Sequence, residues 1–192
     1  KFKNGRGLRI SITLVDSGGH FTQEVYEACR ARQPFRVFAI KGKGGEGVPF
    51  TGPPSKQAIT VPDARGRPRK ASVWLYVLGV DAGKEKIMSA LSVRTLGARF
   101  CHFPAEKERG YDAAFFNGLA SERMVLTPSG KWQWQKITGH RRNEALDCRN
   151  YALAAFCVLD PDMAALERAR RGVGAPAPRT KGRRKVSRGF SV

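Results

Sequence analysis

Three aspartates stand where side chains could bind metal ions. Residues 8 to 16, LRISITLVD, alternate apolar and polar side chains with the period of a strand and end on Asp16, before Ser17-Gly18-Gly19. The apolar run Val73 to Val80 also ends on an acid, Asp81. Asp147 lies inside the helix-like stretch 143 to 159. Two strand-end aspartates and one helix aspartate can hold divalent cations, and carboxylate oxygens suit Mg²⁺ or Mn²⁺.

The helix predicted for residues 143 to 159 is apolar or small around most of its circumference, so we expect it to be largely buried. A buried aspartate is costly unless it is paired or coordinated. For Asp147 the alternative to metal binding is therefore a salt bridge with Arg141, Arg142 or Arg149. Gly139-His140-Arg141-Arg142 immediately before the helix adds positive charge, and the helix N-terminus adds a partial positive charge, so this is a suitable place for a phosphate.

The charge of the chain points to a polyanionic partner. The 192 residues include 35 Lys and Arg against 16 Asp and Glu, a formal charge of +19. Without the six basic residues of 172 to 192 the charge is still +13, so the body of the chain is basic by itself. Nucleic acid is the expected partner. We expect one domain over residues 1 to 165 and a basic, disordered tail over 166 to 192.

Other site classes are not indicated. The four cysteines form no CxxC pair and the three histidines are scattered, so no zinc site is expected. Cys148 and Cys157 fall on the helix predicted to be buried, which favours reduced thiols and an intracellular protein. No apolar run reaches the roughly 18 residues of a membrane span, and no signal peptide opens the chain. Its abrupt start is what an excised domain of a longer protein would show.

The remaining patterns predict alternating strands and helices. We expect helices over 21–32, 84–91 and 111–123, and strands over 36–41, 99–104, 124–127 and 131–138. The loop KGKGGEG lacks the ending of a Walker motif, so it is interpreted as a surface or DNA-facing loop. Residues 49 to 70 form an irregular connection or a hairpin whose basic tip could contact a phosphate backbone. Trp132 and Trp134 share one face of a strand, where core packing is favoured over stacking on bases.

Three stretches resemble one protein family. VDSGGHFTQEVYEACR (15–30), VLGVDAGKEKIMSAL (77–91) and HRRNEALDCRNYALAA (140–155) are similar to the nuclease domain of the large terminase subunit of lambda-like tailed phages. FPAEKERGYDAAFFNGLASERMV (103–125) also looks like that family, so the resemblance covers about residues 8 to 160. It implies an α/β, RNase H-like fold, with a mixed central sheet flanked by helices. No Walker motif is present, so ATP hydrolysis is not expected.

The resemblance implies a metal-dependent endonuclease that cuts concatemeric viral double-stranded DNA during packaging in the host cell cytoplasm. By motif it places the metal ligands at Asp16, Asp81 and Asp147, holding two Mg²⁺ or Mn²⁺ ions. Three close carboxylates repel one another, so we expect at least one raised pKa without metal. Its implied partners are the terminase ATPase domain, the small terminase subunit and the portal, with no membrane partner.

Lys84 follows Asp81 by three residues and could approach the scissile phosphate; the alternative is a surface lysine. Glu85 and Asp112 are reserve ligands. Two other functions remain open: a recombinase or transposase core with the same fold and acids, and a non-catalytic DNA-binding module in which the acids are structural.

Overall fold

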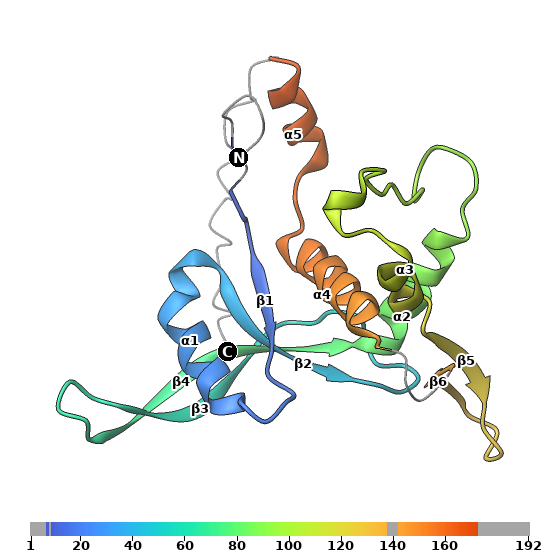
Figure 1. Cartoon of the computed structure of the whole chain (residues 1–192). Coiled ribbons are helices and arrows are strands. Elements are labelled where there is room, and N and C mark those ends of the chain that lie inside the picture. Colours follow the sequence, from blue (N-terminus) through green and yellow to red (C-terminus); the bar gives the residue numbers. More distant parts are fainter. Residues whose placement is uncertain (1–6, 8, 138–141, 173–192) are drawn as a thin grey trace, which may run out of the picture. The chain divides into compact units, whose positions relative to one another are not determined.

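The computed structural model describes residues 7, 9–137 and 142–172 (Figure 1). The chain divides into two compact units, Lys1–Leu159 and Asp160–Val192. In the second unit, helix α5 (Met163–Arg170) begins after Asp162, whose side chain accepts a hydrogen bond from the Ala165 amide at 2.8 Å. Along the described residues no helix combines the length and the apolar character needed to cross a membrane.

A four-stranded mixed sheet organises the first unit. Its strands are β1 (Thr13–Asp16), β2 (Val37–Lys43), β3 (Ser55–Pro62) and β4 (Pro68–Gly79), in the order β1-β2-β4-β3. β1, β2 and β4 run parallel, and β3 pairs antiparallel with β4. The carboxyl ends of the three parallel strands therefore meet at one edge of the sheet, the usual location of ligand sites in α/β folds.

Helices cover both faces of this sheet. Tyr26 and Cys29 of α1 (Thr22–Arg32) pack with Ala39 on one face, whereas Ala154 of α4 (Glu144–Leu159) packs with Ile40 on the other. Ala39 and Ile40 are neighbours in β2, and consecutive strand residues point to opposite faces. The expected mixed sheet flanked by helices is confirmed.

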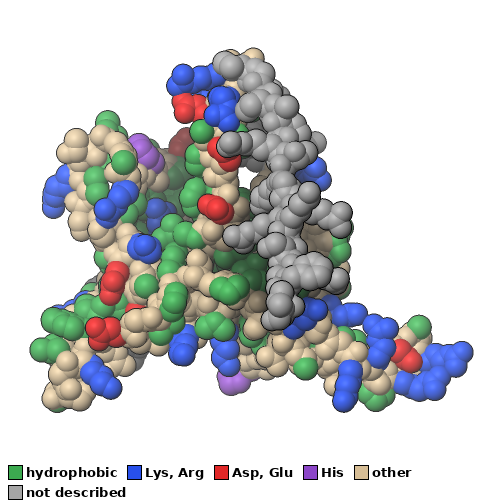
Figure 2. Space-filling view, turned by 180° about the vertical axis from the view of Figure 1, so that it is seen from behind, with side chains coloured by type: hydrophobic (Ala, Val, Ile, Leu, Met, Phe, Trp, Pro, Cys, Tyr) green, Lys and Arg blue, Asp and Glu red, His purple; other side chains and the backbone are tan. Residues whose placement is uncertain are grey.

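β3 and β4 continue beyond the rest of the sheet as a two-stranded arm (residues 55–72). β2 pairs with β4 only from Leu75 to Gly79, whereas β3 pairs with it back to Pro68. The turn at its tip is closed by Asp63, whose carboxylate accepts from the amides of Arg65 and Arg67 at 2.8 Å. The hairpin interpretation of residues 49 to 70 is thus confirmed, and Figure 2 shows Lys and Arg side chains gathered on this arm.

The remaining elements pack at the carboxyl edge. They are α2 (Val80–Leu91), α3 (Ala113–Leu119) and the antiparallel pair β5 (Glu122–Leu126) and β6 (Trp132–Lys136). Ile87, Leu119 and Leu146 form the buried cluster that joins α2, α3 and α4. Single turns of 3₁₀ helix occupy Gln33–Phe35 and Lys107–Arg109. The expected pair of strands joined at residues 128–130 is confirmed.

Several expected elements are wrong. Residues 99 to 104 form no strand; edge-to-face contacts of Phe103 with Phe115 and Phe116 hold this segment instead. The helix expected over 111–123 ends at Leu119, and Glu122 begins β5. The strand expected to reach Asp81 ends at Gly79, where a Cβ would lie 2.4 Å from the Val48 carbonyl oxygen. Asp81 is therefore in the first turn of α2.

Burial also differs from expectation at three places. α4 is buried along only one face, so Cys148 and Cys157 are exposed rather than buried. All four cysteines are free thiols. The first strand is short, and Ile10 is 82% exposed because residues 9 to 12 pair with no described strand. Trp132 is 62% exposed, so core packing is wrong for this side chain. His140, Arg141, the last residue of the strand expected over 131–138 and most of the expected tail lie outside the described residues.

Candidate active site

Asp16 ends β1 in a tightly fixed turn. Ser17 is buried, and both its amide and its hydroxyl donate to the Ile40 carbonyl, at 2.9 and 2.7 Å. The Gly18 amide donates to Asp16 Oδ1 at 2.9 Å. Thr22 closes the turn by donating to the Ser17 carbonyl. The DSGG sequence thus presents the second carboxylate oxygen of Asp16 at the sheet edge.

Tyr151 connects this strand to α4. Its hydroxyl donates to Asp16 Oδ2 at 3.2 Å, and it stands one helical turn after Asp147 on the same face of α4. The pKa of Tyr151 is raised, by burial first and then by the negative charges of Asp16 and Asp147. Asp16 and Asp147 therefore both act on this one phenol, from elements 131 residues apart in sequence.

Asp147 lies among other carboxylates. Burial is the largest cause that raises its pKa, and Glu122 and Asp16 raise it further, against the opposing charges of Lys84 and Lys136. The raised pKa expected of one site acid is thus found at Asp147. Neither Arg142 nor Arg149 pairs with it: Arg142 pairs with Glu144, and Arg149 donates to the Cys101 sulfur. Arg141 lies outside the described residues.

A buried ion pair stands next to Asp147. Lys84 Nζ lies 2.6 Å from Glu122 Oε2, and the two side chains are only 10% and 6% exposed. The side-chain amide of Asn143 donates to Glu122 Oε1 at 2.8 Å and to Asp147 Oδ2 at 2.9 Å. The surface-lysine alternative for Lys84 is therefore wrong, and its charge is held inside the site.

Among the described residues, Asp81 makes no hydrogen bond that links it to Asp16 or Asp147. Asp16 is level with Ile40 and Tyr76 in the sheet, and Gly79 is three residues further along β4. With strands about 4.8 Å apart and about 3.3 Å per residue, the Cα atoms of Asp16 and Gly79 are roughly 14 Å apart. Asp81 follows Gly79, and its Oδ2 accepts from the Gly45 amide at 2.8 Å.

Close packing of α2 on α4 fixes the acids relative to each other. A Cβ on Gly83 would lie 1.9 Å from Asn150 Oδ1, so only glycine allows this approach. Asn150 is 1% exposed and donates to the Val80 carbonyl at 2.9 Å. The first turn of α2, with Asp81 and Lys84, is thereby held against the helix of Asp147.

A pocket of about 600 Å³ opens beside this cluster. Its walls come from the loop after β2, the first turn of α2 and the β5–β6 pair. Its lining residues include Gly45, Asp81, Lys84, Lys131, Trp132 and Trp134. Cationic, aromatic and acidic side chains thus share one cavity next to the aspartates, a combination suited to part of a nucleic acid.

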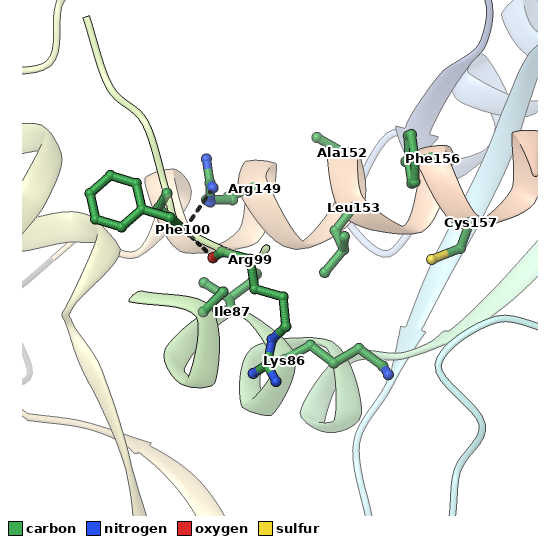
Figure 3. A pocket seen from close by; sticks show the side chains of 11 residues that line it. Lys86, Ile87, Arg99, Phe100, Arg149, Ala152, Leu153, Phe156 and Cys157 are labelled. Carbon is green, nitrogen blue, oxygen red and sulfur yellow. Dashed lines mark hydrogen bonds between the residues drawn. The ribbon is translucent and has the colours of Figure 1, made fainter. Parts of the chain in front are cut away.

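A second pocket, of about 630 Å³, is separate from the acids. Figure 3 shows it between α2 and α4, with Ile87, Leu153 and Phe156 around it and Arg99 and Arg149 near its mouth. Its lining residues Arg149, Ala152 and Phe156 lie about 140° to 200° around the axis of α4 from Asp147, at about 100° per residue. It opens on the opposite face of that helix.

The donor chemistry of the cluster fits a hard divalent cation at Asp16 and Asp147. Both offer carboxylate oxygens, and burial, followed by the nearby carboxylates, raises the pKa of Asp147. Across the described residues, however, no three His, Cys, Asp or Glu side chains gather closely enough to hold a metal ion. Tyr151 links Asp16 to the helix of Asp147, whereas no hydrogen bond or ion pair of the described residues links Asp81 to either acid, so the three-aspartate metal site stays a prediction.

The reserve ligands have other contacts. Asp112 precedes α3 and accepts from the Phe115 amide at 2.9 Å, the arrangement of a helix cap. Glu85 is exposed and borders a smaller pocket with Asp81 and Trp132. Glu122 and Asn143 were not expected at the site. A buried carboxylate at the start of a strand carries no local pattern that reveals its partner 38 residues away.

The whole region matches a known family. The family described as terminase large subunit gpA, endonuclease domain, matches residues 1–168. The large terminase subunit of Escherichia phage lambda is 32% identical over 161 residues, which are 80% of this chain and 23% of that protein. That of Enterobacteria phage P21 is 28% identical over 165 residues, 82% and 24%. The chain thus spans about a quarter of these relatives. No solved structure matches it.

Proposed function

The chain belongs to the family of terminase large subunit gpA endonuclease domains, and we propose that it is a metal-dependent endonuclease that cuts concatemeric viral double-stranded DNA during genome packaging. The observation that carries the proposal is the hydrogen bond from Tyr151 of α4, one helical turn after Asp147, to the carboxylate of Asp16 at the end of β1. Two carboxylates from distant elements at one sheet edge are what a metal-dependent nuclease requires.

We propose that the fold is RNase H-like. Three features support this: an aspartate at the end of the first strand, a second acid directly after a parallel strand, and a third on a helix that packs on the sheet. The mixed sheet with helices on both faces is consistent with it.

The proposed chemistry is phosphodiester hydrolysis with two Mg²⁺ or Mn²⁺ ions. Such ions supply a deprotonated water and stabilise the leaving oxygen. Asp16 and Asp147 would hold metal through their carboxylates, and Tyr151 orients Asp16 by donating to its Oδ2. Asp81 is the proposed third ligand, and its support is the family motif together with its place in the adjoining pocket.

Lys84 is proposed as part of the same site through its charge. Its ammonium group lowers the pKa of Asp147 and lines the pocket beside Asp81. The bond to Glu122 holds the group in place, so it would act on a phosphate through its electric field at short range rather than by reaching out from the surface.

DNA would be held by its backbone. The exposed cations of the β3–β4 arm and the Lys131 side chain in the pocket can pair with phosphates without reading sequence. Trp132, which is exposed at the same pocket, can stack on a base. The ATPase domain, the small terminase subunit and the portal are proposed partners, and the host cell cytoplasm is the proposed location. A domain boundary near residue 165 remains a prediction.

The proposal is tested by nicking and linearisation of plasmid DNA with Mg²⁺, Mn²⁺, Ca²⁺ or EDTA. We expect cutting with Mg²⁺ or Mn²⁺ only, and its loss in Asp16→Asn and in Asp147→Asn while DNA binding is kept or slightly strengthened. Asp160→Asn is the matched control, because it is an exposed aspartate outside the cluster. Asp81→Asn should be as inactive as the other two if all three acids bind metal.

Full nicking by both Asp16→Asn and Asp147→Asn, in protein free of contaminating nuclease, would refute the assignment. Joining of pre-cut ends by the wild-type chain would favour a recombinase or transposase core. DNA binding without cutting in every ion, together with aspartate variants that change stability alone, would favour a non-catalytic binding module.

A further inference from the structure

The side-chain amide of Asn143 donates hydrogen bonds to the carboxylates of both Glu122 and Asp147. Both Glu122 and Asp147 accept hydrogen bonds when ionised and donate none, so the amide nitrogen of Asn143, with its two N–H groups, must face them. The contacts are 2.8 Å to Glu122 Oε1 and 2.9 Å to Asp147 Oδ2. Each N–H therefore serves a different carboxylate.

Glu122 is fully engaged by its neighbours. Its Oε2 is bound to Lys84 and its Oε1 to Asn143, and the residue is only 8% exposed. A carboxylate with both oxygens bound and little access to solvent provides a fixed anchor for the amide. The ion pair compensates its charge, because a buried carboxylate without a partner is strongly disfavoured.

The chain of contacts crosses three elements. Lys84 belongs to α2, Glu122 starts β5, and Asn143 immediately precedes α4. Asp147 lies one turn into α4, and its amide donates to the Asn143 carbonyl at 3.0 Å. The Asp147 carboxylate is thus held by the side-chain amide of Asn143, which is itself bound to Glu122.

We propose that Asn143, anchored by the Lys84–Glu122 pair, is a positioning residue that holds the carboxylate of Asp147 in the orientation needed to bind a divalent cation together with Asp16. The inference rests on the proposed metal-dependent function. Residues that orient metal ligands through hydrogen bonds commonly change metal affinity by about 10- to 100-fold when they are removed. The opposing interpretation is a purely structural contact between α4 and β5.

The test is Mn²⁺ binding by the 192-residue chain, measured by electron paramagnetic resonance or calorimetry, with the substitution Asn143→Ser. Serine is well tolerated directly before a helix, so the start of α4 is kept. Its hydroxyl has one proton and cannot bridge both carboxylates. Asn117→Ser, at an exposed position of α3, is the matched control.

We expect Asn143→Ser to weaken Mn²⁺ binding about tenfold or more and to raise the Mn²⁺ concentration for half-maximal nicking by a similar factor. High Mn²⁺ should restore the rate, and Asn117→Ser should behave as wild type.

Mn²⁺ affinity of a folded Asn143→Ser chain within about twofold of wild type would overturn the proposal, as would a wild-type chain that binds no Mn²⁺. A wild-type chain that binds Mn²⁺ and loses that affinity on Asn143→Ser, yet cuts no DNA, would support the positioning role and refute the nuclease function.

Discussion

At the scale of single residues, Asp147 is an acid whose pKa is raised by burial and by neighbouring carboxylates. Its charge is buried beside Glu122 and Asp16, and Lys84 compensates only part of it. A buried carboxylate near other carboxylates lowers the stability of the metal-free fold, and the same negative charge favours binding of a cation.

We predict that Asp147→Asn raises the melting temperature of the metal-free protein at pH 7, by about 2 °C or more. A carboxyl whose pKa is raised by folding costs stability above that pKa, because the unfolded chain releases the proton more readily. Below the ordinary value of 3.8 both states are protonated, so the gain should shrink as the pH falls toward 4.

Thermal melts in EDTA across this pH range measure the effect, with Asp160→Asn as control. A variant that is less stable than wild type at pH 7 would show that Asp147 is a structural acid. Added Mn²⁺ should reverse the order by stabilising the wild type.

The three aspartates could be selected from sequence because each stands in a locally visible element. The DSGG turn at Asp16 and the helix of Asp147 follow from short-range patterns. The roles of Glu122 and Asn143 could not be predicted, because they depend on contacts between residues 21 and 38 positions apart. The offset of Gly79, directly before α2, from the end of β1 depends on strand register, which the sequence does not display.

At the scale of elements, the β3–β4 arm concentrates positive charge. Arg65, Arg69 and Lys70 are exposed on it. A two-stranded ribbon of this kind can lie along a DNA groove while its cations contact phosphates.

Replacing Arg65, Arg69 and Lys70 by serine should weaken duplex DNA binding. Each lost phosphate contact lowers the slope of log affinity against log salt by about 0.9, so three contacts lower it by up to about 2.7. Fluorescence anisotropy between about 50 and 200 mM salt gives this slope. Serine at Arg32, Arg94 and Arg109 removes the same charge elsewhere on the surface.

Equal loss of affinity and slope in the two triple variants would mean that only total charge matters. A loss confined to the arm variant would assign the arm to the DNA interface. Melting temperatures should be unchanged in both, because all six side chains are exposed.

The strands of the sheet were largely predictable because they show apolar alternation or apolar runs. Between residues 92 and 121 the patterns were less reliable, because the strand expected over 99–104 does not form and α3 ends at Leu119. Aromatic contacts among Phe103, Tyr111, Phe115 and Phe116 organise that stretch, and such contacts leave no periodic pattern. The end of β4 at Gly79 likewise depends on the Pro49 and Phe50 carbonyls, which accept its amide hydrogen bonds from across the chain.

At the scale of the whole molecule, the first compact unit carries most of the positive charge of the chain. Residues 1 to 159 form a compact unit, and by composition they carry +13 of the +19 formal charge. The proposed site acids and the basic arm belong to this unit.

We therefore predict that a chain ending after Leu159 unfolds cooperatively within about 2 °C of the full chain and keeps metal-dependent nicking. Its DNA affinity should fall, because nine basic residues are removed, and its salt dependence should be weaker but still present. Calorimetry and plasmid nicking test this. Loss of a cooperative transition would show that residues 160 to 192 are required for the fold.

The position of β1 in the sheet has a consequence for how the protein would fail on heating. β1 pairs only with β2 among the described strands, over four residues, whereas β3 and β4 share eight paired positions. A short strand at a sheet edge opens at lower free energy than the strands inside. Its departure would carry Asp16 away from Tyr151 and leave the arm, α2 and α4 in place. Reversible thermal inactivation should therefore precede melting, and the protein that has lost its cutting activity should still retain most of its fold.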